Sequence, residues 1–241
     1  MQNLLYFNPT KNIRLSVFPG KDASVDLAQD RELTYRCWRR VWGEVFEKEM
    51  KINKQLFSDE FSRQDIIVSL ICGKSCVGLA MIRLLPLNSE LTFDDSFFRF
   101  WTSKSLNSIS QLCGDSPLAL ASAFTVHPDF RGRSSEINWK SLLLALFLEK
   151  FLTTDAGIMV TAARKIRSNE KLCQSLGAQL LDGNVPYFQD GAKIKGEIAD
   201  LLYWPRNLFI DLGSPALNEL KGNIWKERND KCHPQGERYA A

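Results

Sequence analysis

The sequence is poor in histidine and has no long apolar run. Its 241 residues include only two histidines, His127 and His233, which lie far apart in the chain. This scarcity argues against a metal site built on histidine, so we expect no metal. The longest uninterrupted apolar run, 142–148, has seven residues. A membrane-spanning helix needs about 20 such residues, so we expect none in this chain.

The cysteines show no metal-binding or redox motif. The chain has six, at positions 37, 72, 76, 113, 173 and 232, with no Cys-x-x-Cys and no Cys/His ligand spacing. The first residues also lack a basic segment followed by an apolar run and a cleavage site, so we expect no secretory signal. Together these absences predict reduced thiols and a cytoplasmic location. Cys72 and Cys76 flank a predicted turn, which leaves a disulfide or metal role as an alternative.

The charge balance excludes no small-molecule chemistry but gives little reason to expect a polyanionic partner. The formal net charge is +3, with 44% apolar and 24% charged residues, as in an ordinary globular protein. A nucleic-acid binder would depend only on Arg131 and Arg133 and on the basic cluster at 164–167. We therefore expect no nucleic acid as a partner.

The stretch 119–152 is the most informative part of the chain. An apolar run that includes Phe124, Thr125 and Val126 indicates a buried strand, and Pro128 stops it. A short basic turn follows at 130–135, and from 137 to 152 the pattern predicts a helix that is apolar almost all round. A strand, a tight turn and a helix N-terminus in this order form a site for an anion such as a phosphate.

The turn in this stretch resembles the acyl-CoA binding motif of the GNAT superfamily of N-acyltransferases. That motif has a strand, then Pro-x-Tyr/Phe-Arg-Gly-x-Gly-x-Gly/Ala, then a helix, and the residues from His127 to Arg133 match its front half. Ser134 and Glu136 replace two positions that are usually glycine or another small residue. A serine hydroxyl can still cap a helix, whereas a carboxylate at Glu136 would repel a phosphate.

A second stretch resembles another GNAT signature, Asn-x-x-x-x-x-Tyr-x-x-Leu-Gly-Phe. Asn169, Leu172, Leu176 and Gly177 match it about forty residues after the first motif. Within the same stretch, Ser168 is a predicted helix N-cap and Gly177 a predicted residue after the helix C-terminus. The segment Gly-Lys-x-Cys-Val-Gly-x-Ala at 73–80 is similar to a strand–turn–strand unit of the same superfamily.

The remaining elements follow from hydrophobic periodicity and turn residues. We predict further strands at 12–18, 66–72, 76–85, 157–163, 179–181 and 196–204, with a turn at 182–184. We predict further helices at 28–50, 168–178 and 216–228, and one or two within 86–117. The aromatic residues of the 28–50 helix are interpreted as core, with a place beside an acceptor or acyl pocket as the alternative.

The resemblance implies a fold and a domain organisation. The fold would be α/β (α+β), with a mixed, mostly antiparallel sheet, a central parallel strand pair splayed apart and helices on both faces. Residues 1–205 would form one GNAT-like domain with a helical insertion at 86–117, and residues 206–241 a C-terminal extension. An insertion in this place is also found in the N-acyl amino acid synthases and the autoinducer synthase-like enzymes.

The resemblance also implies which residues bind the donor. Backbone N–H groups of Phe124, Thr125 and Val126 would polarise the thioester, and the turn would bind the phosphates of acetyl-CoA or a longer acyl-CoA. The implied donor-binding residues are completed by Arg131, Gly132, Arg133, Ser134, Ser135 and Asn169.

The catalytic side chains match the superfamily less well. The glutamate that many members carry on the central strand is replaced at positions 120–122 by Leu-Ala-Ser, and Ala123 replaces an arginine of the autoinducer synthases. Cys173 stands where many members have a tyrosine that acts as general acid, so it is one catalytic candidate. His127 is the other, as a base acting through water. Glu44, Glu47 and Asp94 are further candidates.

Two functions of different classes remain open. The first is an N-acyltransferase that moves an acyl group from acyl-CoA, or from an acyl-carrier protein, directly to a primary amine without a covalent intermediate. The acceptor would be a small amine or an amino acid. The second is a catalytically degenerate protein of the same fold that binds an acyl or CoA ligand or a partner. The replaced glycines, Glu136 and Cys173 favour the second hypothesis, whereas the two matching motifs favour the first.

Overall fold

The structure of the protein is a computed structural model. It describes residues 13–21, 24–49, 51, 55–87, 89–99, 101–131, 137–189 and 192–231. Among these residues, no helix has both the length and the apolar character needed to cross a membrane.

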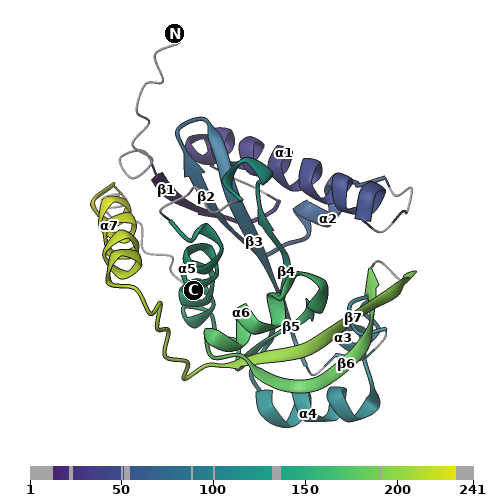
Figure 1. Cartoon of the computed structure of the whole chain (residues 1–241). Helices are drawn as coiled ribbons and strands as arrows, with labels where there is room; N and C mark the ends of the chain where they lie inside the picture. The colour runs from purple at the N-terminus through teal and green to yellow at the C-terminus, as the bar shows by residue number, and fades with distance from the viewer. Residues whose placement is uncertain are drawn as a thin grey trace.

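A seven-stranded mixed sheet forms the centre of the molecule (Figure 1). Its strand order is β1-β2-β3-β4-β5-β7-β6. The strands are β1 (Ile13–Phe18), β2 (Ile66–Cys72), β3 (Ser75–Leu85), β4 (Leu118–Val126), β5 (Ile158–Arg164), β6 (Gln179–Gln189) and β7 (Ala192–Pro205). All neighbouring strands pair antiparallel except β4 and β5, which run parallel. This arrangement confirms the predicted fold class.

Helices cover both faces of the sheet, with α1 and α2 on one side and α5 and α7 on the other (Figure 1). The α-helices are α1 (Ala28–Glu44), α2 (Ser58–Ser62), α3 (Glu90–Phe93), α4 (Ser103–Cys113), α5 (Trp139–Leu152), α6 (Asn169–Ser175) and α7 (Pro215–Lys231). A π-helical turn at Val45–Glu49 continues α1, and short 3-10 helices lie at Val25–Leu27, Pro128–Phe130 and Lys165–Arg167. The helices α3 and α4 confirm the prediction of one or two helices within 86–117.

The parallel pair β4–β5 separates after three residue pairs. Leu118, Ala119 and Leu120 pair with Ile158, Met159 and Val160, and the register stops there. Both strands continue, β4 to Val126 and β5 to Arg164, but β5 then pairs only with β7. One side-chain contact bridges the beginning of the gap, from Thr161 Oγ1 to the main-chain oxygen of Ala121 at 3.2 Å. The predicted splay between these strands is therefore present.

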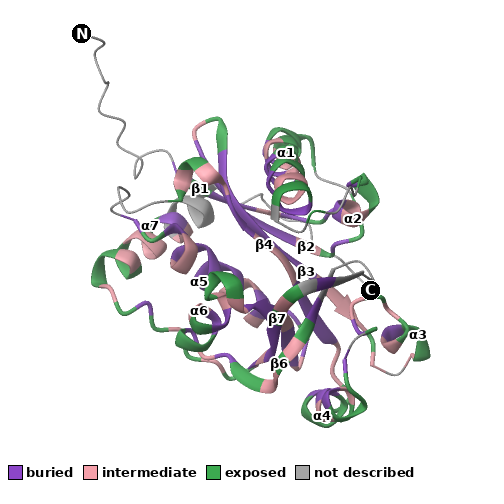
Figure 2. Ribbon diagram, turned by 45° about the vertical axis from the view of Figure 1, so that its right-hand side comes forward, coloured by how far each residue is buried: buried purple, intermediate pink, exposed green. Residues whose placement is uncertain are grey.

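The two faces of the sheet are packed differently. On the α5 face a single apolar cluster runs from β1 to β7 and includes almost the whole of α5. On the α1 face there are two clusters, one under α1 and one under α4. Figure 2 shows the buried strands in the centre and the exposed residues on the outer sides of the helices. The α5 helix is buried nearly all round, as its sequence predicts.

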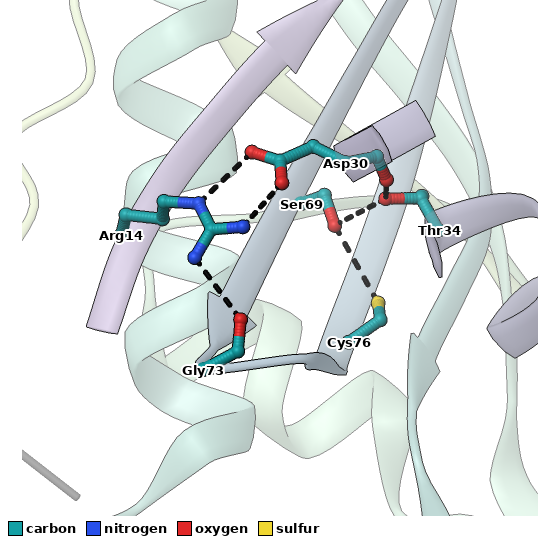
Figure 3. Close-up of polar contacts among 6 residues, drawn as sticks. All are labelled: Arg14, Asp30, Thr34, Ser69, Gly73 and Cys76. Atoms are coloured by element: carbon teal, nitrogen blue, oxygen red, sulfur yellow. Dashed lines mark hydrogen bonds and ion pairs between the residues drawn. The ribbon is translucent and has the colours of Figure 1, made fainter. Parts of the chain in front are cut away.

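A polar network anchors the first half of α1 to the sheet (Figure 3). Arg14 of β1 forms an ion pair with the buried Asp30 and donates to the main-chain oxygen of Gly73 at 3.1 Å. Thr34 Oγ1 donates to the main-chain oxygen of Asp30 at 2.7 Å and lies 2.8 Å from Ser69 Oγ. Ser69 Oγ in turn lies 3.5 Å from Cys76 Sγ. These contacts set the position of α1, and so of the aromatic side chains further along it.

Several predicted boundaries are wrong. The segment 182–184 is not a turn between strands, because β6 continues through it with register shifts and with Asn184 at φ 55°. The helix α5 begins at Trp139, later than predicted, and its N-cap is Asn138, whose Oδ1 accepts from the N–H of Ser141 at 3.1 Å. Ser168 occupies the N-cap position of α6 but makes no side-chain capping bond. Gly177 has φ 85° directly after α6, as predicted for a left-handed helix end.

Candidate active site

A cavity of about 230 Å³ lies at the splay between β4 and β5. Its walls come from the second half of β4, from Thr161 to Arg164 of β5, and from Asn169 and Cys173 of α6. On the α1 face it reaches Trp38, Trp42 and Phe46, and on the α5 face Leu144 and Phe147. The cavity thus passes through the sheet at the point where the two strands part.

A second cavity, of about 520 Å³, opens at the carboxyl ends of β4 and β5. It is lined by the end of β4, by Phe130 and Arg131, and by the first residues of α5. Arg164, Asn169 and Trp42 line both cavities, so the two are neighbours. Together they give a ligand a path from the N-terminus of α5 to the middle of the sheet.

The strand β4 has a bulge where it faces the gap. On β3 one residue lies between Leu79 and Met81, whereas on β4 two lie between their partners Thr125 and Ser122. Ala123 takes the extra position with φ 51°, a conformation that residues with a Cβ seldom adopt. A bulge redirects the neighbouring backbone groups, here toward an edge that β5 has left.

Side chains around the bulge hold it in place. Thr125 Oγ1 donates to the main-chain oxygen of Ala123 at 2.7 Å and accepts from Trp42 Nε1 at 3.0 Å. Across the sheet, a Cβ added at Gly78 would approach the Thr125 carbonyl oxygen to 2.5 Å, so only glycine fits there. Trp42 therefore does more than pack in the core, because its indole N–H links α1 to the bulge.

Basic residues gather at the mouth of the second cavity. Arg131, Lys140, Arg164 and Arg167 all line it. Arg131 Nε donates to the main-chain oxygen of Val126 at 2.6 Å, and Lys140 Nζ donates to that of Arg167 at 3.3 Å. Burial, the largest effect, lowers the pKa of Lys140 against the opposing effects of Cys173 and Glu170, because removal of water disfavours the charged form of an amine. An anion bound here would favour the charged form of Lys140.

His127 lies at the end of β4 but lines neither cavity. Its main-chain N–H donates to the carbonyl of Val77, and its Nε2 lies 3.1 Å from Nη1 of Arg40. Because a guanidinium only donates, Nε2 is the acceptor in this pair. Burial, and after it the charges of Arg40 and Arg131, lower the pKa of His127 against the opposing effect of Asp129. The ring is neutral at pH 7, but its Nε2 lone pair is already engaged.

Cys173 and Asn169 lie in the cavity wall, one helical turn apart on α6. Burial raises the pKa of the Cys173 thiol to about 12, against a smaller opposing effect of Lys140. A thiol this weak as an acid is a poor proton donor to a leaving thiolate, whose pKa is near 8.5. Asn169 Oδ1 is buried and has no hydrogen-bond partner among the described residues, so it is an unsatisfied acceptor in a residue that lines both cavities.

Sequence reasoning missed a buried ion pair beside the cavity. Arg164, the last residue of β5, makes two hydrogen bonds of 2.7 Å to Glu197 of β7, and both side chains are less than a tenth exposed. The Arg164 guanidinium also lies over the ring of Tyr187. Arg164 was noticed in the sequence only as part of a basic cluster. No local pattern links positions 164 and 197, because strand pairing brings them together.

The structure places the other candidate residues as follows. Phe124, Thr125 and Val126 line the second cavity, as does Arg131. Gly132, Arg133, Ser134, Ser135 and Glu136 lie outside the described residues. Glu44 is 3.5 Å from Arg40, and neither it nor Glu47 or Asp94 lines a cavity, whereas Asp95 does.

The cysteines of the described part of the chain carry no disulfide and no metal site. Cys37, Cys72, Cys76, Cys113 and Cys173 are free and buried, so a disulfide between Cys72 and Cys76 is excluded. Among the described residues no group of three or more His, Cys, Asp or Glu side chains is arranged to hold a metal ion.

Comparison with known proteins shows the fold through structure rather than sequence. No family model and no curated protein matches the chain. The structure of BjaI, a CoA-dependent acyl-homoserine lactone synthase, with SAM and isopentyl-CoA matches 88% of this chain and 90% of its own with a TM-score of 0.52 and 12% identity. FeeM, an N-acyl amino acid synthase from uncultured soil microbes, matches 80% and 92% with a TM-score of 0.51 and 11% identity. At these identities the likeness establishes the fold alone.

Proposed function

We propose that this chain, which has the GNAT fold, is an N-acyltransferase that transfers an acyl group from acyl-CoA to a primary amine. The observation that carries the proposal is the open splay between β4 and β5. It holds a cavity that crosses the sheet and joins a second cavity with a basic mouth. BjaI, a CoA-dependent acyl-homoserine lactone synthase, and FeeM, an N-acyl amino acid synthase, share the fold of this chain, which supports the same class of reaction.

The donor would enter from the second cavity. Its phosphates would lie near Lys140, Arg131 and Arg167 and near the N-terminus of α5, where backbone dipoles favour an anion. The predicted contacts of Gly132, Arg133, Ser134 and Ser135 belong to the same proposal. The pantetheine arm would then run into the gap between β4 and β5, and the thioester would lie near the bulge at Ala123.

The chemistry needs little more than positioning and a polarised carbonyl. The amine nitrogen attacks the thioester carbon, the C–N bond forms and the C–S bond breaks. The amine proton finally reaches the thiolate. Because the amine attacks the thioester directly, no covalent enzyme intermediate arises. Backbone N–H groups of the bulged part of β4, between Ala123 and Val126, would stabilise the oxyanion. Such a site is built from the backbone and needs no glutamate on β4.

The two candidate proton-transfer residues are supported unequally. Cys173 lines the cavity on the helix that follows β5, which is a suitable place for a group near the leaving sulfur, but its raised pKa argues against proton donation. His127 has a lowered pKa, as a base at neutral pH requires, yet its Nε2 faces Arg40 outside the cavities. Either role would require water as the carrier.

A binding protein that has lost catalysis is the second candidate. It is favoured by the absence of a carboxylate from the walls formed by β4 and β5, where residues 120–124 and 161–164 supply none. The distinction between the two is turnover. A binding protein would hold the CoA ligand in the same cavities and release no thiol.

The test combines binding and turnover. Calorimetry with acetyl-CoA, a long-chain acyl-CoA and an acyl-carrier protein measures donor choice, and release of free thiol in the presence of amines measures transfer. Ala162 lines the cavity and is only partly buried, so Ala162→Phe would obstruct it. We expect this variant to lose at least about tenfold in donor affinity, since a bulky ring in the gap removes the space for pantetheine.

Ala216→Phe, at an exposed position of α7, is the matched control and should bind like the unmodified protein. Donor binding without thiol release for any amine tested would favour the binding protein. Absence of donor binding in the unmodified protein would exclude both candidates.

A further inference from the structure

The end of the cavity farthest from the basic mouth is polar. It lies on the α1 face, between α2, the end of β3 and the residues after α3. The polar side chains there are Glu60, Arg63, Gln64, Arg83, Asp95 and Ser96. Nothing in the proposed transfer chemistry uses these residues, and none of them is part of the motifs described above.

Arg83 and Asp95 close this end of the cavity. Arg83 Nη2 donates to Asp95 Oδ1 at 2.6 Å, and the same oxygen accepts from the main-chain N–H of Phe97 at 2.9 Å. Both charged side chains are less than a fifth exposed. The pair ties β3 to the segment after α3 and therefore fixes part of the wall of the cavity that Gln64 also lines.

Gln64 has an acceptor with no partner. Its residue exposure is 8%, it lines the cavity, and its Oε1 is buried without a hydrogen bond among the described residues. The orientation of the amide is determined, because Nε2 donates to the main-chain oxygen of Glu60 at 2.9 Å and a carbonyl oxygen only accepts. A flipped amide would place two acceptors against each other, so the unpartnered atom is Oε1.

The backbone around Gln64 is held from two sides. Its carbonyl accepts from the N–H of Gly20 at 2.8 Å, and the next N–H, of Asp65, donates to Ile82 of β3 at 3.0 Å. The approach of Gly20 is so close that a Cβ there would lie 2.3 Å from the Phe61 carbonyl oxygen. Gln64 is therefore a preorganised acceptor rather than a mobile surface residue.

We propose that Gln64 is a specificity residue that accepts a hydrogen bond from the far end of the acceptor amine. The inference rests on the proposed function. The amine of the acceptor would lie at the thioester near β4, and its far end would carry a neutral hydroxyl or amide N–H directed at Gln64 Oε1. The two arginines and two carboxylates of the polar end balance in formal charge, which favours a neutral donor over a second ammonium group.

The expected selectivity comes from a difference between two acceptors, one that pairs with Gln64 Oε1 and one that leaves it unpaired. An acceptor with a donor group at the correct distance satisfies Oε1, whereas an alkyl group of the same size leaves a buried carbonyl unpaired and so incurs the full desolvation cost of that group. A site that hydrogen-bonds a substrate hydroxyl rejects the analogue without it far more strongly than an apolar pocket does. The preference should therefore appear at one chain length and not at others.

The experiment compares amino alcohols with alkylamines of the same size. Ethanolamine, propanolamine and pentanolamine are matched with propylamine, butylamine and hexylamine, and putrescine and cadaverine test a second ammonium group. We expect the unmodified protein to prefer one amino alcohol over its alkylamine by about tenfold or more in kcat/KM, mainly through KM. Gln64→Leu should abolish that preference and leave the calorimetric affinity for acyl-CoA unchanged.

Gln174→Leu, at an exposed position of α6, is the matched control and should keep the preference. Gln64→Met serves as a second variant where Gln64→Leu fails to fold, judged by circular dichroism and melting temperature. Ligand-observed NMR of the same amines, without any thioester, tests Gln64 separately from turnover. Loss of turnover with the NMR preference intact would contradict the proposed function alone. An unmodified protein with no preference at any length, a preference that survives Gln64→Leu, or a stronger preference for diamines would overturn the inference.

Discussion

The apolar side chains pack differently on the two faces of the sheet. Under α5 the apolar side chains form one continuous cluster from β1 to β7. Under α1 and α4 they form two clusters, and the cavity lies where the two meet. Ala162 and Val185 pack at the edge of both clusters and line that cavity. The candidate site thus lies where the packing of one face is interrupted, while the other face is packed continuously.

Where the apolar packing of the α1 face is interrupted, charged groups are buried, and polar contacts offset the energetic cost of burying them. Buried charged groups need partners, and on the α1 face Arg164 has Glu197 and Arg83 has Asp95. The α5 face has few such pairs and relies on apolar burial from the nine buried residues of α5, all of which are apolar. A substitution on the α1 face should therefore disturb both stability and ligand binding, whereas one on the α5 face, away from the residues that line the cavities, should disturb stability alone.

The largest effect is expected from breaking the buried ion pair of the interrupted face. Arg164→Met leaves Glu197 buried without a counter-charge, which destabilises a protein by about 3–5 kcal/mol. Arg164 also lines both cavities, so donor affinity should fall as well. Chemical denaturation with and without acetyl-CoA measures the two effects together.

The double variant Arg164→Met/Glu197→Met separates charge from packing. A buried pair replaced by apolar side chains of similar volume is often neutral in stability. We expect the double variant to regain most of the lost stability but not the donor affinity. Equal losses in the single and double variants would mean that packing, and not the unpaired carboxylate, accounts for the effect.

Leu146→Ala tests the continuous face. Leu146 is fully buried in α5 and lines neither cavity. Its truncation should destabilise the fold by about 2–5 kcal/mol through lost burial and the space left behind. Donor affinity should stay the same, measured by calorimetry at a temperature where the variant is folded. Leu91→Ala, at a residue that is 80% exposed, is the control and should change stability by less than about 0.5 kcal/mol.

The contrast between the faces also explains what the sequence could predict. The apolar run of α5, the parallel strands and the splay follow from hydrophobic pattern and from the two motifs, and the structure has all of them. The bulge at Ala123 was not predicted, because alanine gives no local sign of a positive φ. Gln64 and Arg164 were missed as site residues for another reason. The role of Arg164 depends on Glu197, which strand pairing brings from a distant part of the chain. The proposed role of Gln64 depends on the shape of a cavity that several elements line.

The start of α5 belongs to the continuous face and also lines the second cavity, so we expect substitutions there to have effects of intermediate size. Asn138 caps the helix through its Oδ1 and lines the second cavity. Asn138→Ala removes the cap and should cost about 1 kcal/mol of stability. Asn138→Asp keeps a capping oxygen but adds a negative charge where the phosphates of the donor are proposed to lie. We expect this variant to keep its melting temperature and to bind acetyl-CoA more weakly, most clearly at low salt. Unchanged binding by Asn138→Asp would place the phosphates elsewhere.

The smallest effect is expected at Cys173, where the two faces meet inside the splay. Its thiol lines the cavity, but burial raises its pKa to about 12, so it gives up a proton less readily than a free thiol. The raised pKa also means that Cys173 contributes stability while protonated and loses it only as pH rises above the ordinary thiol value, toward about 12.

Near neutral pH, Cys173→Ala should therefore lower stability by about 1 kcal/mol through lost packing and change kcat by less than about threefold. General acid catalysis supplies about 10²–10⁴-fold, so a loss of tenfold or more in kcat, with donor affinity intact, would restore Cys173 as the proton donor. Cys173→Ser is the matched variant, because it replaces the thiol with a hydroxyl donor of similar size. Activity that survives in Cys173→Ser but not in Cys173→Ala would also assign the residue a role in proton transfer, since packing alone does not distinguish the two variants in that direction.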